Sequence, residues 1–162
     1  MKHLLSLILL LFVIIVFQLV GLSTMIRPVL ASQEKLNPLQ VTAIKAGIRD
    51  PGTEILNAVS MASRQTGLSE ALILSLMYSE SSFKPNAVSS KQYHGLMQVP
   101  QKVHYPDANC LIGARIFLEK LKITDGDYRK AITLYKGWPI NHPEGKRQAD
   151  KVIVLARKLK DV

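Results

Sequence analysis

The sequence predicts an all-α domain that follows one N-terminal apolar segment. Aromatic residues make up only 6% of the 162 residues, and Leu, Ile and Ala are common, which favours helices over a β-sandwich. Apolar residues recur at helical spacing in several segments, and turn or capping residues separate these segments. We therefore expect a signal peptide or signal anchor over 1–31, a linker with a short helix over 32–52, and a helical catalytic domain over 53–162.

The helices have recognisable starts and stops. Asn37-Pro38 is typical of a helix start, and Asp50-Pro51-Gly52 is typical of a turn. Thr53 and Ser69 are expected to cap the next two helices. The predicted helices are a short one from Pro38 and longer ones over about 53–66, 70–80, 106–121, 128–135 and 146–160. Between Ser82 and Val103, prolines and polar residues predict a long irregular segment, which is often functional in a compact domain.

The N-terminus predicts export. Leu4–Val20 is almost wholly apolar and follows Lys2, as in an export signal. The run is also long enough, at the short end, to cross a bilayer. Val29-Leu30-Ala31 would permit cleavage before Ser32, so a cleaved signal and an uncleaved anchor both remain open. In either case the domain is expected in the periplasm or cell envelope, and an uncleaved segment would anchor it to the inner membrane.

The charge balance favours an anionic partner. The chain has 21 Lys and Arg against 12 Asp and Glu, a formal charge of +9, which suits cell wall, anionic lipid or nucleic acid. No zinc spacing, basic heptad or aromatic RNA motif is present, so nucleic acid is not expected. His94 and His104 lack a third ligand at metal spacing, so neither a metal nor another cofactor is expected. Cys110, the only cysteine, shares a helical face with Ala114 and Phe117 and is predicted to be a core residue.

Glu80 is the first candidate catalytic residue. It follows Ile73, Leu76 and Met77 at spacings of seven, four and three residues, which place it on their helical face. Lys84 is the only Lys or Arg three or four residues away, and the Pro after it disfavours a helical pairing. A carboxyl in an apolar setting without a close cation retains its proton more readily, as a general acid must. A helix-terminal Glu pointing to water is the alternative.

The sequence around Glu80 resembles a known family. Glu80-Ser81-x-Phe83-x-Pro85-x-Ala87-x-Ser89, followed by Gly95-Leu96-Met97-Gln98, closely resembles the lytic transglycosylases with the lysozyme-like fold, which are related to goose-type lysozymes. The resemblance covers about Thr53 to Leu159. It implies cleavage of the β-1,4 bond between N-acetylmuramic acid and N-acetylglucosamine in peptidoglycan, with closure of a 1,6-anhydro ring and Glu80 as the single acid and base.

The resemblance also implies residues that bind the glycan. Ser89 matches the serine of the loop after the catalytic helix, and Met97 and Gln98 match positions that line the cleft. Tyr135 matches the tyrosine of a later Ala-Tyr-Asn-Ala-Gly motif, near the catalytic glutamate. Tyr93 is a further candidate for contact with sugar.

The chain departs from the family pattern in two places. The later motif reads Leu134-Tyr135-Lys136-Gly137, so Lys136 stands where Asn is usual. Gln92-Tyr93 stands where Gly-Ala is frequent before the Gly-Leu-Met-Gln turn. These differences concern the details of the subsites more than the identity of the acid.

Other functions remain open at this stage. A muramidase of the lysozyme type would transfer the same sugar to water. A peptidoglycan-binding protein without activity, or an accessory factor of a secretion or envelope assembly, could use the same domain. Ordinary glycosidases need a second carboxylate, and Glu70, Asp107 and Glu119 have no context comparable to that of Glu80.

Overall fold

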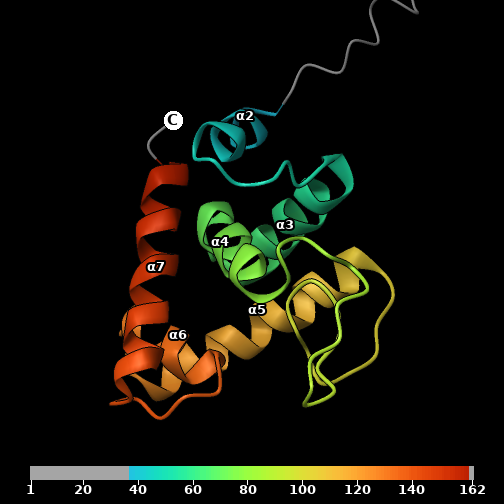
Figure 1. Ribbon diagram of the computed structural model, residues 1–162. Helices are drawn as coiled ribbons and strands as arrows, with labels where there is room; N and C mark the ends of the chain where they lie inside the picture. The colour runs from blue at the N-terminus through green and yellow to red at the C-terminus, as the bar shows by residue number, and fades with distance from the viewer. Residues whose placement is uncertain (1–36, 161–162) are drawn as a thin grey trace, which may run out of the picture. The chain divides into compact units, whose positions relative to one another are not determined.

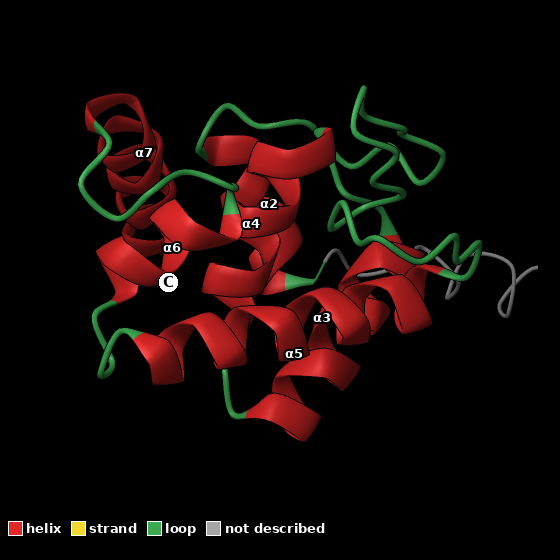
Figure 2. Cartoon of the chain, turned by 90° about the horizontal axis from the view of Figure 1, so that it is seen from below, coloured by secondary structure: helices red, strands yellow, loops and turns green. Residues whose placement is uncertain are grey.

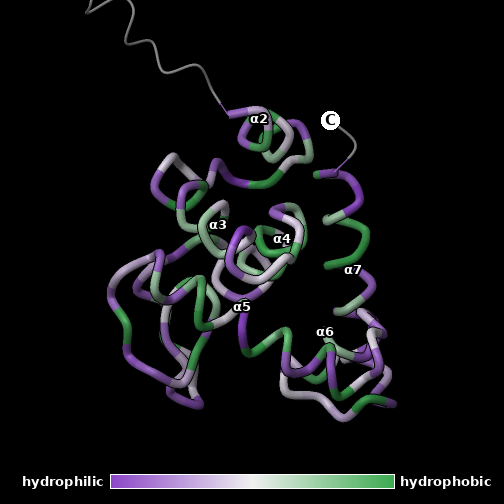
Figure 3. Tube along the Cα trace, turned by 180° about the vertical axis from the view of Figure 1, so that it is seen from behind, coloured by the Kyte–Doolittle hydropathy of each residue, from purple (hydrophilic) through white to green (hydrophobic). Residues whose placement is uncertain are grey.

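Helix α4, Glu70–Ser81, lies at the centre of the computed structural model, which describes residues 37–160. It contacts α3, α5 and α7, and these helices surround it (Figure 1 and Figure 3). Every residue from Ala71 to Met77 is buried, so the helix is apolar on all sides as a central helix must be. The three apolar residues that share a face with Glu80 are thus only part of the buried surface of α4, because neighbours cover both of its faces. Only its last turn emerges from the core.

The other helices confirm the all-α class. In chain order they are α2 (Pro38–Lys45), α3 (Thr53–Thr66), α5 (Pro106–Ile123), α6 (Tyr128–Tyr135) and α7 (Pro143–Lys160). Helix α3 packs on α5, while α7 contacts α2, α4 and α6. Residues 37–160 contain no strand, and β-pairing within this range is limited to isolated bridges of His94 with Val88 and Val99 (Figure 2).

Two predicted helix starts differ from the structure. Gly52 is the N-cap of α3 without a side-chain cap hydrogen bond, and Thr53 is the first helical residue. Helix α7 begins at Pro143, three residues before the predicted start, because Pro is well tolerated in the first turn of a helix. The cap at Ser69 is confirmed, since its hydroxyl accepts a hydrogen bond from the N–H of Leu72 at 3.3 Å.

The core joins the central helix to its neighbours. The helices contribute buried apolar side chains that together fill the space between them. Major members are Val59, Ala62, Ile73, Leu74, Leu76, Met77, Ala114, Phe117, Ile132, Ala149 and Val152. Burying one such large side chain stabilises the fold by about 1.5–3 kcal/mol, so this core fixes the position of the last turn of α4.

The irregular segment between α4 and α5 is anchored at both ends. Phe83 is buried and its ring lies 5.3 Å from the ring of Tyr78 in α4. Leu96, Met97 and Val99 are also buried, so the second half of the segment returns to the core. This part of the chain forms the longest green loops in Figure 2. The prediction of a long irregular segment between Ser82 and Val103 is confirmed.

The expectations about the N-terminus lie outside the described residues. Leu4–Val20 and the cleavage site before Ser32 belong to the range 1–36, so the signal peptide, anchor and inner-membrane association stay predictions. Within residues 37–160, no helix is both long and apolar enough to span a bilayer. The domain division at Thr53 also stays a prediction, and α2, which precedes it, packs against α7.

Candidate active site

Glu80 lies in the last turn of α4, where the chain leaves the core. Its side chain is 14% exposed, between the buried Met77 and the exposed surface. Ser82 ends the helix in a left-handed conformation with φ of 50°, and its N–H bonds to the carbonyl of Tyr78. The sharp turn that follows sends the chain away and leaves the Glu80 carboxyl at the edge of the core.

Lys136 forms an ion pair with Glu80. The Nζ of Lys136 lies 2.8 Å from Oε1 of Glu80 and 2.7 Å from Oγ of Ser79. The Lys136 side chain is only 10% exposed. The expectation that Glu80 lacks a close cation is therefore wrong. The cation comes from the C-terminal end of α6, 56 residues away in sequence, so helical spacing around Glu80 could not reveal it.

The Gly95–Gln98 turn is held by main-chain and side-chain bonds. The N–H of His94 bonds to the carbonyl of Val99 at 2.8 Å, and the reverse bond is 3.0 Å. Gln98 donates through Nε2 to the carbonyls of Gly95 and Ala87, at 2.9 and 3.2 Å. The amide donor of Gln98 thus closes the loop upon itself. Met97 is completely buried, and its side chain packs in the core.

Asn109 clamps this turn from helix α5. It is 2% exposed, accepts a hydrogen bond from the N–H of Met97 at 2.9 Å and donates one to the carbonyl of His94 at 3.0 Å. Gly95 lies so close that a Cβ there would be 2.3 Å from Nδ2 of Asn109. The sequence analysis missed Asn109. A buried polar residue within the apolar face of α5 is the signal that could have identified it.

Tyr135 connects α6 to the same turn. Its hydroxyl donates to the main-chain carbonyl of Met97 at 2.8 Å. Burial raises the pKa of Tyr135 well above its ordinary value, and the negative charge of Glu80 raises it further. The phenol therefore stays protonated as a hydrogen-bond donor. Gly113 permits this approach, because a Cβ there would lie 2.4 Å from Met97 and 3.0 Å from the Tyr135 hydroxyl.

Ser89 and Tyr93 belong to the outer part of the irregular segment. The Ser89 hydroxyl accepts a hydrogen bond from the N–H of Tyr93 at 3.0 Å, and the N–H of Ser89 bonds to the carbonyl of Tyr93. Ser89 thus closes a small turn. The Tyr93 side chain is 41% exposed. The structure therefore joins Ser89 to Tyr93, Met97 to Tyr135, and Glu80 to Lys136.

The sequence of this helical domain matches the model of a known family. The model of the transglycosylase SLT domain matches residues 57–152, more than half of the chain. The chain belongs to this family. The match includes Glu80, the Gly95–Gln98 turn, Tyr135 and Lys136. It confirms the resemblance noted from the sequence and gives the protein, in general terms, a lytic transglycosylase-type function directed at peptidoglycan.

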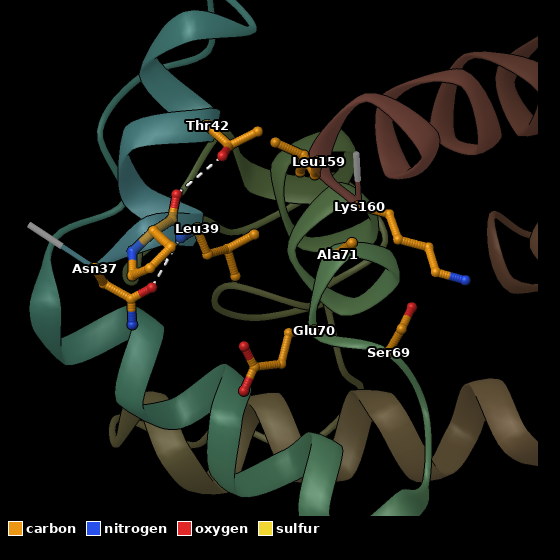
Figure 4. A pocket seen from close by; sticks show the side chains of 9 residues that line it. Asn37, Leu39, Thr42, Ser69, Glu70, Ala71, Leu159 and Lys160 are labelled. Atoms are coloured by element: carbon orange, nitrogen blue, oxygen red, sulfur yellow. Dashed lines mark hydrogen bonds between the residues drawn. The ribbon is translucent and has the colours of Figure 1, made fainter. Parts of the chain in front are cut away.

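Two pockets within residues 37–160 lie beside α4, one near its start and one near its end. One, of about 360 Å³, lies at the start of the helix and is lined by Glu70 and Leu159 among others (Figure 4). Glu70 is ten residues before Glu80, about 15 Å along a helix axis, so this pocket is remote from the ion pair. The second, of about 520 Å³, is lined by Ser79 and Lys136 from one side and by Glu144 and Lys151 of α7 from the other.

The single cysteine of the SLT domain is a core residue, as predicted. Cys110 is completely buried in α5. Burial, with a smaller contribution from the charge of Asp107, raises the pKa of the Cys110 thiol to about 12. A thiol of this kind is protonated at neutral pH and is a poor nucleophile. Within residues 37–160, no three His, Cys, Asp or Glu side chains are grouped so that they could hold a metal ion.

Proposed function

We propose that this protein is a peptidoglycan lytic transglycosylase that cleaves the β-1,4 bond between N-acetylmuramic acid and N-acetylglucosamine and leaves a 1,6-anhydro end. The observation that carries the proposal is the position of Glu80 within a matched SLT domain. The carboxyl stands at the end of a buried helix, 14% exposed, with Oε1 fixed by Lys136. Its second oxygen is the one that we assign to the substrate.

In the proposed reaction Glu80 transfers a proton twice. As an acid it protonates the glycosidic oxygen, the C1–O bond breaks, and the muramic acid ring acquires oxocarbenium character. As a carboxylate it then accepts the proton of the C6 hydroxyl while that oxygen bonds to C1. No water is consumed, and Glu80 returns to its protonated form. General acid–base assistance of this kind contributes typically about 10²–10⁴-fold to a rate.

The bonds around the Gly95–Gln98 turn support a division of roles among the other site residues. We assign direct contact with the glycan to Tyr93, whose side chain is well exposed. Ser89, Gln98 and Tyr135 make internal hydrogen bonds, so we assign them to shaping the loop. The side chain of Met97 lies in the core, so we assign no contact with the glycan to it. Its main-chain carbonyl accepts the hydrogen bond from Tyr135 and so helps to hold the turn.

In a hydrolytic mechanism, Glu144 is the candidate for the second carboxylate, which would activate water. It lines the same pocket as Lys136 and Ser79, and the sequence analysis did not consider it. Both of its oxygens already accept hydrogen bonds at 2.8 Å, from Arg147 and from Gln148. These bonds lower the pKa of Glu144, the one from Gln148 most. A carboxylate so engaged is poorly placed to activate water, which favours the transglycosylase over the muramidase.

The proposed substrate sets the location. Peptidoglycan lies outside the cytoplasmic membrane, so the domain must be exported, and we assign export to Leu4–Val20. A reporter active only outside the cytoplasm, fused after Val162, should be active, and deletion of Leu4–Val20 should abolish its activity. Equal activity with and without the segment would contradict this role. A location outside the cytoplasmic membrane is compatible with an inner-membrane anchor and with a role in a secretion or envelope assembly.

The products test the reaction. The purified protein is incubated with cell wall, and the released muropeptides are analysed by mass spectrometry. Anhydro ends, one water lighter than hydrolytic ends, are expected. Reducing ends would make the protein a muramidase with the same acid. Binding to wall without release of fragments would make it a peptidoglycan-binding protein. Glu144→Gln, which removes a carboxylate but leaves Glu80 and Lys136 in place, should give the same anhydro products.

A further inference from the structure

Lys136 is placed to act on Glu80 and on the end of α4 together. Its ammonium has three donors, and it lies 2.8 Å from Oε1 of Glu80, 2.7 Å from Oγ of Ser79 and 3.5 Å from the carbonyl of Ser79. The last turn of α4 contains no basic residue of its own. Lys136 therefore also supplies the positive charge that stabilises the C-terminal end of a helix dipole.

The pair is shielded from water more than the other ion pairs of residues 37–160. The side chains of Lys136 and Glu80 are 10% and 14% exposed, whereas those of Arg129 and Asp150 are both 49% exposed. Exposed ion pairs contribute little and are screened by salt. Shielded charges interact more strongly, so the ammonium must influence both the orientation and the charge of the carboxyl.

We propose that Lys136 is a positioning residue for Glu80, which fixes one carboxyl oxygen and so leaves the other for proton transfer. This inference rests on the function proposed above. With Oε1 held by the ammonium, Oε2 is the oxygen that exchanges a proton with the glycan. A variant without the ammonium should bind the wall as well as the wild type does and release fragments more slowly.

Other titratable groups around the pair are accounted for. Tyr135, beside Lys136 in sequence, stays neutral because burial raises its pKa. Cys110 of α5 stays protonated. Tyr78 of α4, and Glu144 and Lys151 of α7, line the pocket beside Lys136, and Glu144 is bonded to Arg147 and Gln148. The charge in direct contact with Glu80 is that of Lys136, so a change at this residue should have the largest effect on the orientation of the carboxyl.

The test compares four forms of the full chain: wild type, Lys136→Met, Lys136→Arg and Lys151→Met. The initial rate of fragment release is measured over a range of concentrations of purified wall. In Lys136→Met kcat should fall several-fold while KM stays near that of the wild type, because the variant loses the orientation of the acid and not a contact with the glycan. Lys136→Arg, which keeps a charged donor, should retain most of kcat. Lys151→Met removes a charge from the same pocket and should leave both constants unchanged.

A second measurement does not depend on activity. Urea unfolding of wild type, Lys136→Met, Glu80→Gln and the double variant forms a double-mutant cycle, in which a non-zero coupling between the two side chains is expected. A kcat of Lys136→Met equal to that of the wild type would overturn the inference and leave the proposed function intact. So would an absence of coupling in the cycle. Wild-type protein that releases no fragments would instead remove the proposed function, and the positioning role of Lys136 with it. If Lys136→Met does not fold, Lys136→Gln, which removes the charge and keeps a donor, takes its place in both measurements.

Discussion

The hydroxyl of Tyr135 donates a hydrogen bond to the main-chain carbonyl of Met97 at 2.8 Å, across 38 residues of sequence. This bond ties the end of α6 to the Gly95–Gln98 turn. Lys136 follows Tyr135 directly and bonds to Glu80. One stretch of two residues therefore holds both the turn and the proposed catalytic carboxyl. The geometry of the site depends on where α6 ends.

Tyr135→Phe should lower stability without changing the fold. It leaves the carbonyl of Met97, a buried residue, without its donor, at a cost of about 1–3 kcal/mol. Urea unfolding followed by circular dichroism would measure the change. Tyr128→Phe is the matched control in the same helix, since Tyr128 is half-exposed, and should stay within about 0.5 kcal/mol of wild type. Equal effects of the two variants would argue against a structural role for the Tyr135 hydroxyl.

Asn109→Ala should destabilise the turn more strongly. It removes the acceptor of the Met97 N–H and one of the two donors to the His94 carbonyl, which keeps its bond from the Val99 N–H. We expect a loss of at least about 2 kcal/mol and faster proteolysis within residues 82–105. Asn57→Ala changes an exposed Asn of α3 and serves as the control. Unchanged stability of Asn109→Ala would mean that water replaces the side chain at little cost.

Glu80→Gln should abolish fragment release and leave wall binding intact. Gln keeps the shape and can accept the Lys136 hydrogen bond, but it cannot deliver a proton. Because one residue serves both half-steps, the loss should reach or exceed about 10⁴-fold, the upper end of general acid–base effects. Glu70→Gln, at the opposite end of α4, should retain activity. Comparable activity of the two variants would exclude Glu80 from the mechanism.

The same substitution also has a defined effect on stability. A carboxyl without a cation would make Glu80→Gln slightly stabilising, because an uncompensated charge near the core is costly. The ion pair with Lys136 reverses this expectation, since the substitution leaves a shielded ammonium with a neutral partner. We expect a destabilisation of about 1–3 kcal/mol at neutral pH. Thermal or urea unfolding distinguishes the two signs directly, and a more stable variant would show that the pair costs more than it contributes.

The raised pKa of the Cys110 thiol predicts that the folded protein loses stability at alkaline pH. Its pKa is about 12 in the folded protein against an ordinary 9.0. The folded state therefore holds a proton that the unfolded state releases, and the contribution to stability is complete below about pH 9 and is lost as the pH rises towards 12. The slope is about 1.4 kcal/mol per pH unit. Cys110→Ala lacks this titration, so the stability difference between it and wild type should shrink above pH 9 by that amount per unit. Parallel curves would contradict a buried thiol.

The sequence by itself determined the helical class, most helix boundaries and the candidate acid. These properties depend on local patterns: apolar spacing, the cap at Ser69, the prolines of the irregular segment, and the fixed positions from Glu80 to Gln98. Helices are stabilised by neighbours within one or two turns, so such patterns suffice. The buried state of Cys110 followed in the same way, from its place on the apolar face of α5.

Only the tertiary structure decided the environment of that acid. Lys136 meets Glu80, Tyr135 meets Met97, and Asn109 meets His94 and Met97 across 12 to 56 residues of sequence. Such contacts depend on how α4, α5 and α6 pack, and packing follows from the combined shapes of many side chains. The sequence could place a carboxyl at the end of a buried helix. The packing of the helices decided that Lys136, at the end of α6, lies beside this carboxyl.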